Sequence, residues 1–142
     1  MNNNKISKKA LVIAVNPTIR AVSKFVLSDY IKCAFIKSSP EGKHFLKASD
    51  DIRVLVLDWS IQDKYGSVLK CLKEAKARKN VLVVNIFASS EQKKYIINSL
   101  PNLAHNNKIY NITSDFMEIS LTIALFKLKK RIYKKTNSSE LK

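Results

Sequence analysis

The chain has 142 residues, of which 46% are hydrophobic, and this is enough for one domain with a buried core. Only two glycines and three prolines occur, which disfavours an all-β fold with many tight turns. Its 26 lysines and arginines against 11 acidic residues give a formal net charge of +15. A charge of this sign favours acidic partners, such as nucleic acid, an anionic membrane surface or an acidic protein.

The ends of the chain and its two cysteines indicate a cytoplasmic protein. Cys33 and Cys71 form no CxxC motif, so we expect two reduced thiols. The first nine residues lack the apolar segment of a secretory signal, and no apolar run approaches the roughly 18 residues of a membrane span. We expect a flexible basic N-terminus over 1–8, one domain over 9–135 and a flexible tail over 136–142.

Five short runs rich in Val, Ile and Leu alternate with segments whose apolar residues recur at helical spacing. The runs predict strands over 10–15, 32–37, 52–57, 81–87 and 108–112. The segments between and after them predict helices from Asn16–Pro17 onwards, over 40–48, around Val68–Ala75, after Ser89 or Ser90, and over 116–135. This alternation implies right-handed crossovers and an α/β fold in which helices cover both faces of a parallel sheet.

Chemistry in such a sheet is expected at the carboxyl ends of the strands, and Asp58 directly follows the third apolar run. Gly66 stands eight residues later, and Asn16-Pro17-Thr18 follows the first strand. Together these features resemble the receiver domain of response regulators, over roughly residues 9 to 130. The resemblance implies a flavodoxin-like, doubly wound (βα)5 fold with five strands in the order 2-1-3-4-5. It also implies that Asp58 corresponds to the aspartate that accepts a phosphoryl group.

The residues around that aspartate depart from the receiver pattern. Ala14 and Val15 stand where receivers carry the acidic pair that holds Mg²⁺, which leaves Asp58 and the Ser60 carbonyl as too few oxygen ligands. Phe87 stands where the hydroxyl switch residue would be. Thr113 or Ser114 falls where a lysine would end the fifth strand. Phosphoryl transfer depends on positioning and charge stabilisation, so we predict a degenerate pocket without metal, cofactor or catalytic residue.

Several single residues allow two interpretations. Asp58 is either a phosphoacceptor that a dedicated kinase or small phosphodonor can still reach, or an inherited carboxylate held by hydrogen bonds or a lysine. Trp59 is either an aromatic at the rim of the crevice or a partly buried anchor of the loop. His44 and His105 stand alone in polar surroundings, so we expect both at the surface.

The last helix carries two apolar stripes, although a helix that covers a sheet needs only one. The first consists of Met117, Leu121, Ala124, Leu125, Leu128 and Ile132. The second consists of Phe116, Ile119, Ile123 and Phe126. This second stripe indicates an interface with a protein partner or a second copy, unless the helix is simply sunk more deeply between its neighbours.

Basic residues follow the second stripe, with Lys129, Lys130 and Arg131 at their centre. They are either a solvated face that suits the carboxyl end of a helix, or a contact for phosphates or an acidic protein. The leading prediction is an atypical receiver (a pseudo-receiver), not an enzyme, that signals by binding a protein partner independently of conventional Mg²⁺-dependent phosphorylation. The alternatives are a phosphorelay receiver that accepts phosphate on Asp58 by an atypical route, and a basic nucleic-acid-associated protein.

Overall fold

Five strands alternate with five helices in the computed structural model, which describes residues 6–60, 65–78, 80–100, 106 and 108–140. The strands are β1 (Ile6–Ile13), β2 (Ile31–Ile36), β3 (Ile52–Asp58), β4 (Leu82–Phe87) and β5 (Ile109–Thr113). The helices are α1 (Pro17–Leu27), α2 (Ser39–Ala48), α3 (Tyr65–Lys76), α4 (Ser90–Ser99) and α5 (Met117–Glu140). In this part of the chain no helix is both long and apolar enough to cross a membrane.

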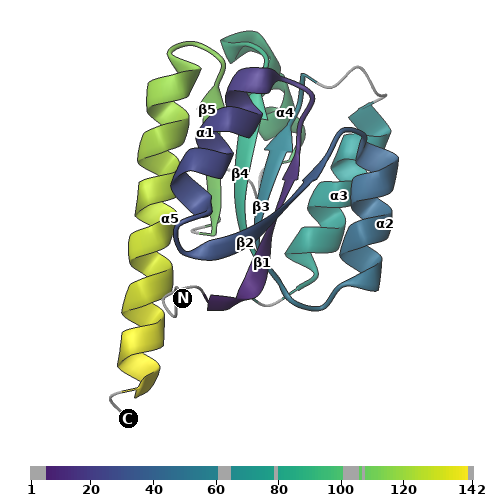
Figure 1. Cartoon of the computed structure of the whole chain (residues 1–142). Helices are drawn as coiled ribbons and strands as arrows, with labels where there is room; N and C mark the ends of the chain where they lie inside the picture. Colours follow the sequence, from purple (N-terminus) through teal and green to yellow (C-terminus); the bar gives the residue numbers. More distant parts are fainter. Residues whose placement is uncertain (1–5, 61–64, 79, 101–105, 107, 141–142) are drawn as a thin grey trace.

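All five strands run parallel in one sheet with the order β2-β1-β3-β4-β5 (Figure 1). This is the order of flavodoxin-like α/β folds, so the predicted fold class is confirmed. The central strands β3 and β4 are buried almost throughout because helices cover both of their faces. Their unbroken apolar runs are the physical reason that the sequence predicted a parallel sheet.

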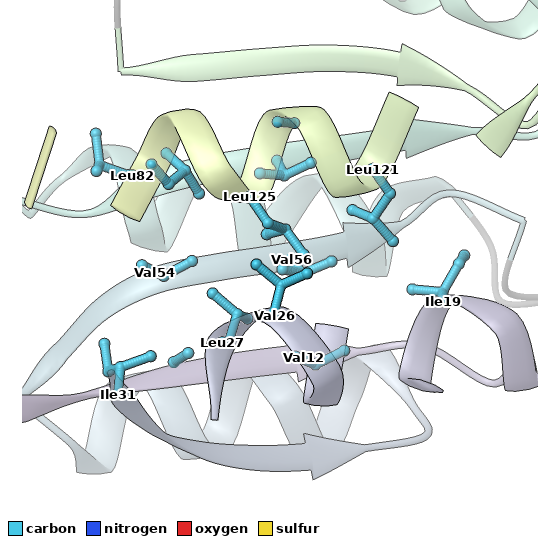
Figure 2. Close-up of a cluster of buried hydrophobic side chains, with 14 of the residues drawn as sticks. Val12, Ile19, Val26, Leu27, Ile31, Val54, Val56, Leu82, Leu121 and Leu125 are labelled. Carbon is cyan, nitrogen blue, oxygen red and sulfur yellow. The ribbon is translucent and has the colours of Figure 1, made fainter. Parts of the chain in front are cut away.

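Two hydrophobic layers separate the helices from the sheet. One lies under α1 and α5, where Val12, Val26, Val56 and Leu125 meet between the strands and the two helices (Figure 2). The other lies under α2, α3 and α4 and includes Leu46, Leu72 and Ile96. Residues that alternate along each strand therefore belong to opposite layers, and each helix buries one apolar face against the sheet.

Several boundaries differ from the sequence prediction, most by one residue; β1 ends at Ile13 and not at Val15. Residues 6–8, expected to be flexible, belong to β1, where Ile6 pairs with Ile31 of β2. This pairing is made by the backbone, so the polar residues Ser7 and Lys8 do not prevent it. The last helix continues to Glu140, because 136–140 contain no Gly or Pro that would end it. It begins at Met117 and not at Phe116, whose φ of 50° is left-handed. The third helix, expected around Val68–Ala75, begins at Tyr65 and so includes Gly66 in its first turn.

Candidate functional site: the carboxyl-end pocket around Asp58

Asp58 is the last residue of β3, and the strand order places it between the ends of β1 and β4. It pairs with Ile86 of β4, and on the other side Ala14 lies one residue beyond the last pair of β1 and β3. Alternation along β3 puts its side chain on the α1 and α5 face, with Val54 and Val56. The carboxylate is only 1% exposed, so apolar strand ends enclose it rather than an open crevice.

Ser60 holds one oxygen of the Asp58 carboxylate. The Ser60 backbone N–H donates to Asp58 Oδ1 at 2.9 Å, and the Ser60 hydroxyl donates to the same oxygen at 2.5 Å. This turn is the local motif by which an aspartate bonds the backbone two residues later. The other oxygen, Oδ2, is buried and has no hydrogen-bond partner among the described residues. The predicted hydrogen-bonded carboxylate is therefore found at one oxygen of Asp58 and not at the other.

The residues predicted to line a degenerate pocket lie at this end of the sheet but face different ways. Ala14 is fully buried beside Asp58, whereas Val15 is 53% exposed beyond the strand. Phe87 is fully buried in the opposite layer, under α2, α3 and α4, so it does not face Asp58. On the Asp58 face the end of β4 presents Ile86, and neither Phe87 nor Ile86 offers a hydroxyl. Assigning the switch position to Phe87 therefore misjudged which face of the sheet its side chain occupies.

Thr113 ends β5 and pairs with Phe87, and Ser114 follows it outside the strand. The Ser114 backbone N–H donates to the Phe87 carbonyl at 2.8 Å, and its hydroxyl donates to the Ala88 carbonyl at 2.5 Å. Ser114 thus extends the pairing between the ends of β4 and β5. The Ser114 hydroxyl is already engaged by a backbone carbonyl, and neither Thr113 nor Ser114 supplies an ammonium group.

The side chains at this site do not fit the Mg²⁺ that a receiver resemblance implies. Mg²⁺ requires several oxygen ligands in near-octahedral geometry, and Ala14 and Val15 contribute no side-chain oxygen. Asp58 Oδ1 already accepts two hydrogen bonds from Ser60. No group of three or more His, Cys, Asp or Glu side chains that could hold a metal ion occurs in the described part of the chain.

Trp59 lies in the core and not at the rim of a crevice. It is 1% exposed, and its ring lies 5.5 Å from that of Phe87 at an interplanar angle of 30°. Its indole N–H donates to Asn85 Oδ1 at 2.9 Å, and the Asn85 amide donates to Asn111 Oδ1 at 3.0 Å. This chain of hydrogen bonds ties β3, β4 and β5 together under the α2, α3 and α4 layer. Trp59 is therefore the loop anchor of the second interpretation, more deeply buried than expected.

Two residues that the sequence interpretation missed help to shape this end of the sheet. Asn85 is a lone amide within the apolar run Val81–Phe87, and it precedes no turn; this isolation is a signal for a buried hydrogen bond. Gln92 of α4 donates to the Trp59 carbonyl at 3.2 Å and accepts from the Ala88 N–H at 2.7 Å. It links the loops after β3 and β4, but nothing in its sequence context marks it.

The second stripe of α5 is exposed, as the sequence predicted. Phe116, Ile119, Ile123 and Phe126 are 82%, 63%, 49% and 45% exposed. The first stripe is buried against the sheet and α1, apart from the partly buried Met117. The stripes lie on opposite sides of the helix, so α5 is not sunk between its neighbours. We call the four exposed side chains the outer α5 stripe.

The basic residues near this stripe are partly engaged by aromatic rings of the same chain. The Lys129 ammonium lies 5.6 Å from the Tyr30 ring centroid and 6.0 Å from that of Phe126. The Arg131 guanidinium donates to the Tyr110 hydroxyl at 3.2 Å. Lys130, in contrast, is exposed. His44 is also exposed, as expected, whereas His105 lies outside the described residues.

Comparison with known proteins supports the fold and names no family. No protein-family model and no curated protein matches the chain. One similar solved structure is titled as a yeast Spc42 trimeric coiled coil, amino acids 181–211, fused to another structure. It is 12% identical, with a TM-score of 0.57 over 96% of this chain and 86% of that one. At this identity the likeness concerns the fold alone.

Proposed function

We propose that this protein is a pseudo-receiver: a cytoplasmic signalling module that binds a protein partner and does not depend on Mg²⁺-dependent phosphorylation. The observation that carries the proposal is the state of Asp58. Its carboxylate is 1% exposed, one of its oxygens is held by Ser60, and its strand neighbours are Ala14 and Ile86. A phosphodonor would have to reach a buried carboxylate that, among the described residues, has no metal ligands or lysine beside it to stabilise the transferring charge, and the neighbouring Ser60 hydroxyl already donates to Asp58 Oδ1.

Phosphodonors test this half of the proposal directly. The protein is incubated with Mg²⁺ and acetyl phosphate, or with beryllofluoride, and followed by intact mass and amide chemical shifts. Because the pocket lacks the groups that stabilise the transferring charge, we expect neither a mass increase nor shifts around Asp58. A phosphoryl adduct that disappears in Asp58→Asn would contradict the proposal.

A phosphoryl adduct on Asp58 would establish the second candidate function, an atypical phosphorelay receiver. One observation favours it: Asp58 Oδ2 has no hydrogen-bond partner among the described residues, so a lone pair is not already committed. Local opening of the end of β3 would be needed to expose this oxygen. The donor experiment therefore decides between the two candidates.

The outer α5 stripe supports the other half of the proposal. It consists of three large apolar side chains on the outside of α5, whose opposite face is buried, and of Phe116 immediately before the helix. Exposed apolar patches of this kind mark protein contacts. The carboxyl-terminal half of the stripe, Ile123 and Phe126, is followed by the exposed Lys127 and Lys130, so the charge there complements an acidic partner and opposes a second copy with the same lysines. We therefore place an acidic protein ahead of a homodimer or nucleic acid.

Substitutions in the stripe test the surface. Ile123→Glu and Phe126→Glu place a carboxylate at its centre and should weaken partner capture by at least roughly tenfold, as loss of a central contact of about 1.4 kcal/mol would do. Phe25→Glu is the matched control, because Phe25 is 78% exposed on α1. Light scattering of the free proteins checks self-association. Equal binding by the stripe variants and the control would refute this surface.

A further inference from the structure

A basic hollow lies between α2 and α3, on the opposite face of the sheet from α5. Its volume is about 330 Å³, which is at the lower end of ligand pockets. The residues that line it are Pro40, Lys43, His44, Lys47 and Lys70. Three lysines and a histidine thus surround one concavity, and the described residues of its lining include no acidic side chain. We call it the α2–α3 basic pocket.

The spacing of the residues explains how the charges converge. Pro40, Lys43, His44 and Lys47 stand at positions i, i+3, i+4 and i+7, so they form one face of α2. Lys70 reaches the same hollow from α3. Lys43 and Lys47 are like charges one turn apart, an arrangement that destabilises a helix.

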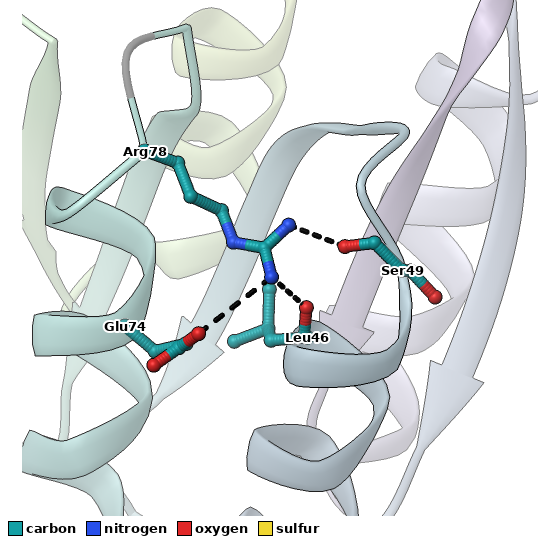
Figure 3. Close-up of polar contacts among 4 residues, drawn as sticks. All are labelled: Leu46, Ser49, Glu74 and Arg78. Atoms are coloured by element: carbon teal, nitrogen blue, oxygen red, sulfur yellow. Dashed lines mark hydrogen bonds and ion pairs between the residues drawn. The ribbon is translucent and has the colours of Figure 1, made fainter.

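No acid neutralises these lysines within the described residues. The ion pairs there are Lys9 with Asp51 at 3.5 Å and Arg78 with Glu74 at 3.6 Å. Glu74 follows Lys70 by one turn of α3, but its carboxylate points to Arg78 (Figure 3). In the described part of the chain, the lysines of the pocket therefore have no carboxylate at ion-pair distance.

Contacts at both ends of α2 hold the pocket walls in place. Arg78 follows α3 and donates hydrogen bonds to the carbonyls of Leu46 and Ser49, which close the carboxyl end of α2 (Figure 3). At the other end, the Cys71 thiol donates to the Ser39 carbonyl at 3.1 Å. The pocket lysines therefore project from two helices that are fastened together, which lowers the ordering cost of binding a ligand.

We propose that the α2–α3 basic pocket binds the phosphate group of a small, highly charged ligand. The ammonium groups of Lys43, Lys47 and Lys70 donate to the phosphate oxygens, and the His44 ring offers a further donor. The bound charge relieves the repulsion among the lysines, and the hydrogen bonds are of the strong, charge-assisted kind. The inference is independent of the pseudo-receiver proposal, because the pocket shares no residue with the Asp58 site or the outer α5 stripe.

Titration with pyrophosphate, followed by amide chemical shifts of the full chain, tests the proposal. We expect saturable shifts confined to Pro40–Lys47 and the neighbourhood of Lys70. A variant with Lys43→Gln, Lys47→Gln and Lys70→Gln should bind at least roughly tenfold more weakly, because each charged hydrogen bond is worth about that factor. The matched control changes Lys24, Lys32 and Lys76 to Gln. These lysines are also exposed, so the control loses the same charge elsewhere and should bind within about twofold of the unchanged protein.

A lipid headgroup could supply the same phosphate chemistry, so a second arm uses vesicles. Sedimentation with phosphatidylcholine vesicles that contain phosphatidic acid is compared for the same three proteins. Binding of vesicles but not pyrophosphate, lost only in the pocket variant, supports the site with a lipid as the source. The proposal is overturned if neither probe binds, if the shifts map elsewhere, or if both variants lose binding equally.

Discussion

Three buried side-chain oxygens lack a hydrogen-bond partner in the described part of the chain: Ser23 Oγ, Tyr30 OH and Asp58 Oδ2. An unsatisfied buried polar group loses its hydration without regaining a hydrogen bond, so each opposes folding. For Asp58 the two hydrogen bonds from Ser60 offset this cost at one oxygen only. Stabilisation of the fold therefore does not explain why a carboxylate is buried at this position.

Tyr30 provides a prediction at the same scale. Its side chain is fully buried, and burial raises the pKa of its hydroxyl, with smaller contributions from Cys33 and Tyr133. The unfolded chain loses this proton as the pH rises above 10.0, whereas the folded chain retains it. The stability linked to this group is thus present below pH 10.0 and is lost as the pH rises from there towards the folded pKa.

We expect Tyr30→Phe to be neutral or to stabilise the protein by up to about 1 kcal/mol at pH 7, because it removes an unsatisfied hydroxyl. It should also reduce the fall in unfolding free energy above pH 10.0. Urea unfolding followed by circular dichroism at several pH values measures both. Tyr95→Phe is the control, since Tyr95 is 66% exposed. If both variants keep the slope of the unchanged protein, the loss of stability above pH 10.0 does not come from Tyr30.

Among the elements, α2 packs closely on β1 because Gly42 faces the sheet. A Cβ atom at this position would lie 2.2 Å from Ile13 Cδ1 and 2.8 Å from Ile13 Cγ1. No other residue could approach the strand so closely without moving Ile13. The glycine lowers the intrinsic helix propensity of α2 in exchange for this contact.

We expect Gly42→Ala to destabilise the protein by about 1–3 kcal/mol through overpacking, despite its better helix propensity. Ile13→Val removes Cδ1, so the double variant should be less destabilised than the two single changes added together. Urea unfolding of the four proteins gives this coupling. A Gly42→Ala variant as stable as the unchanged protein would show that α2 can shift without cost.

For the whole molecule, the net charge of +15 is spread over a small surface and repels itself. Few carboxylates are available to pair with the lysines, because acidic residues number only 11. Electrostatic repulsion therefore lowers the free energy of unfolding, and mobile anions should raise it again by screening the charges.

We expect the unfolding free energy to increase by on the order of 1 kcal/mol between low and physiological ionic strength, because salt screens the repulsion. Thermal unfolding at several sodium chloride concentrations measures this. The variant with Lys24, Lys32 and Lys76 changed to Gln should show a shallower dependence. A midpoint that falls or stays constant as salt is added would contradict this view of the charge.

The fold was predictable because β3 and β4 are buried on both faces and so carry unbroken apolar runs. The position of Ala14 beside Asp58 followed from parallel strands ending at one edge. The burial of Trp59 could not be predicted, because it depends on the path of the chain after β3. The face of the sheet that Phe87 occupies was also missed, because it depends on how side chains alternate along β4. The contact between Asn85 and Asn111 depends on register, which a single sequence does not reveal.

The packing of α1 against α5 joins the first helix of the chain to the last. During synthesis, β1, α1, β2, α2 and β3 leave the ribosome early and can pair in the order they emerge. The layer that contains Val12, Val26 and Val56 is nevertheless covered only by α1 until Leu121–Ile132 has emerged. A nascent chain therefore exposes part of this apolar surface until α5 has left the ribosome, so this layer is completed late in the folding of the domain.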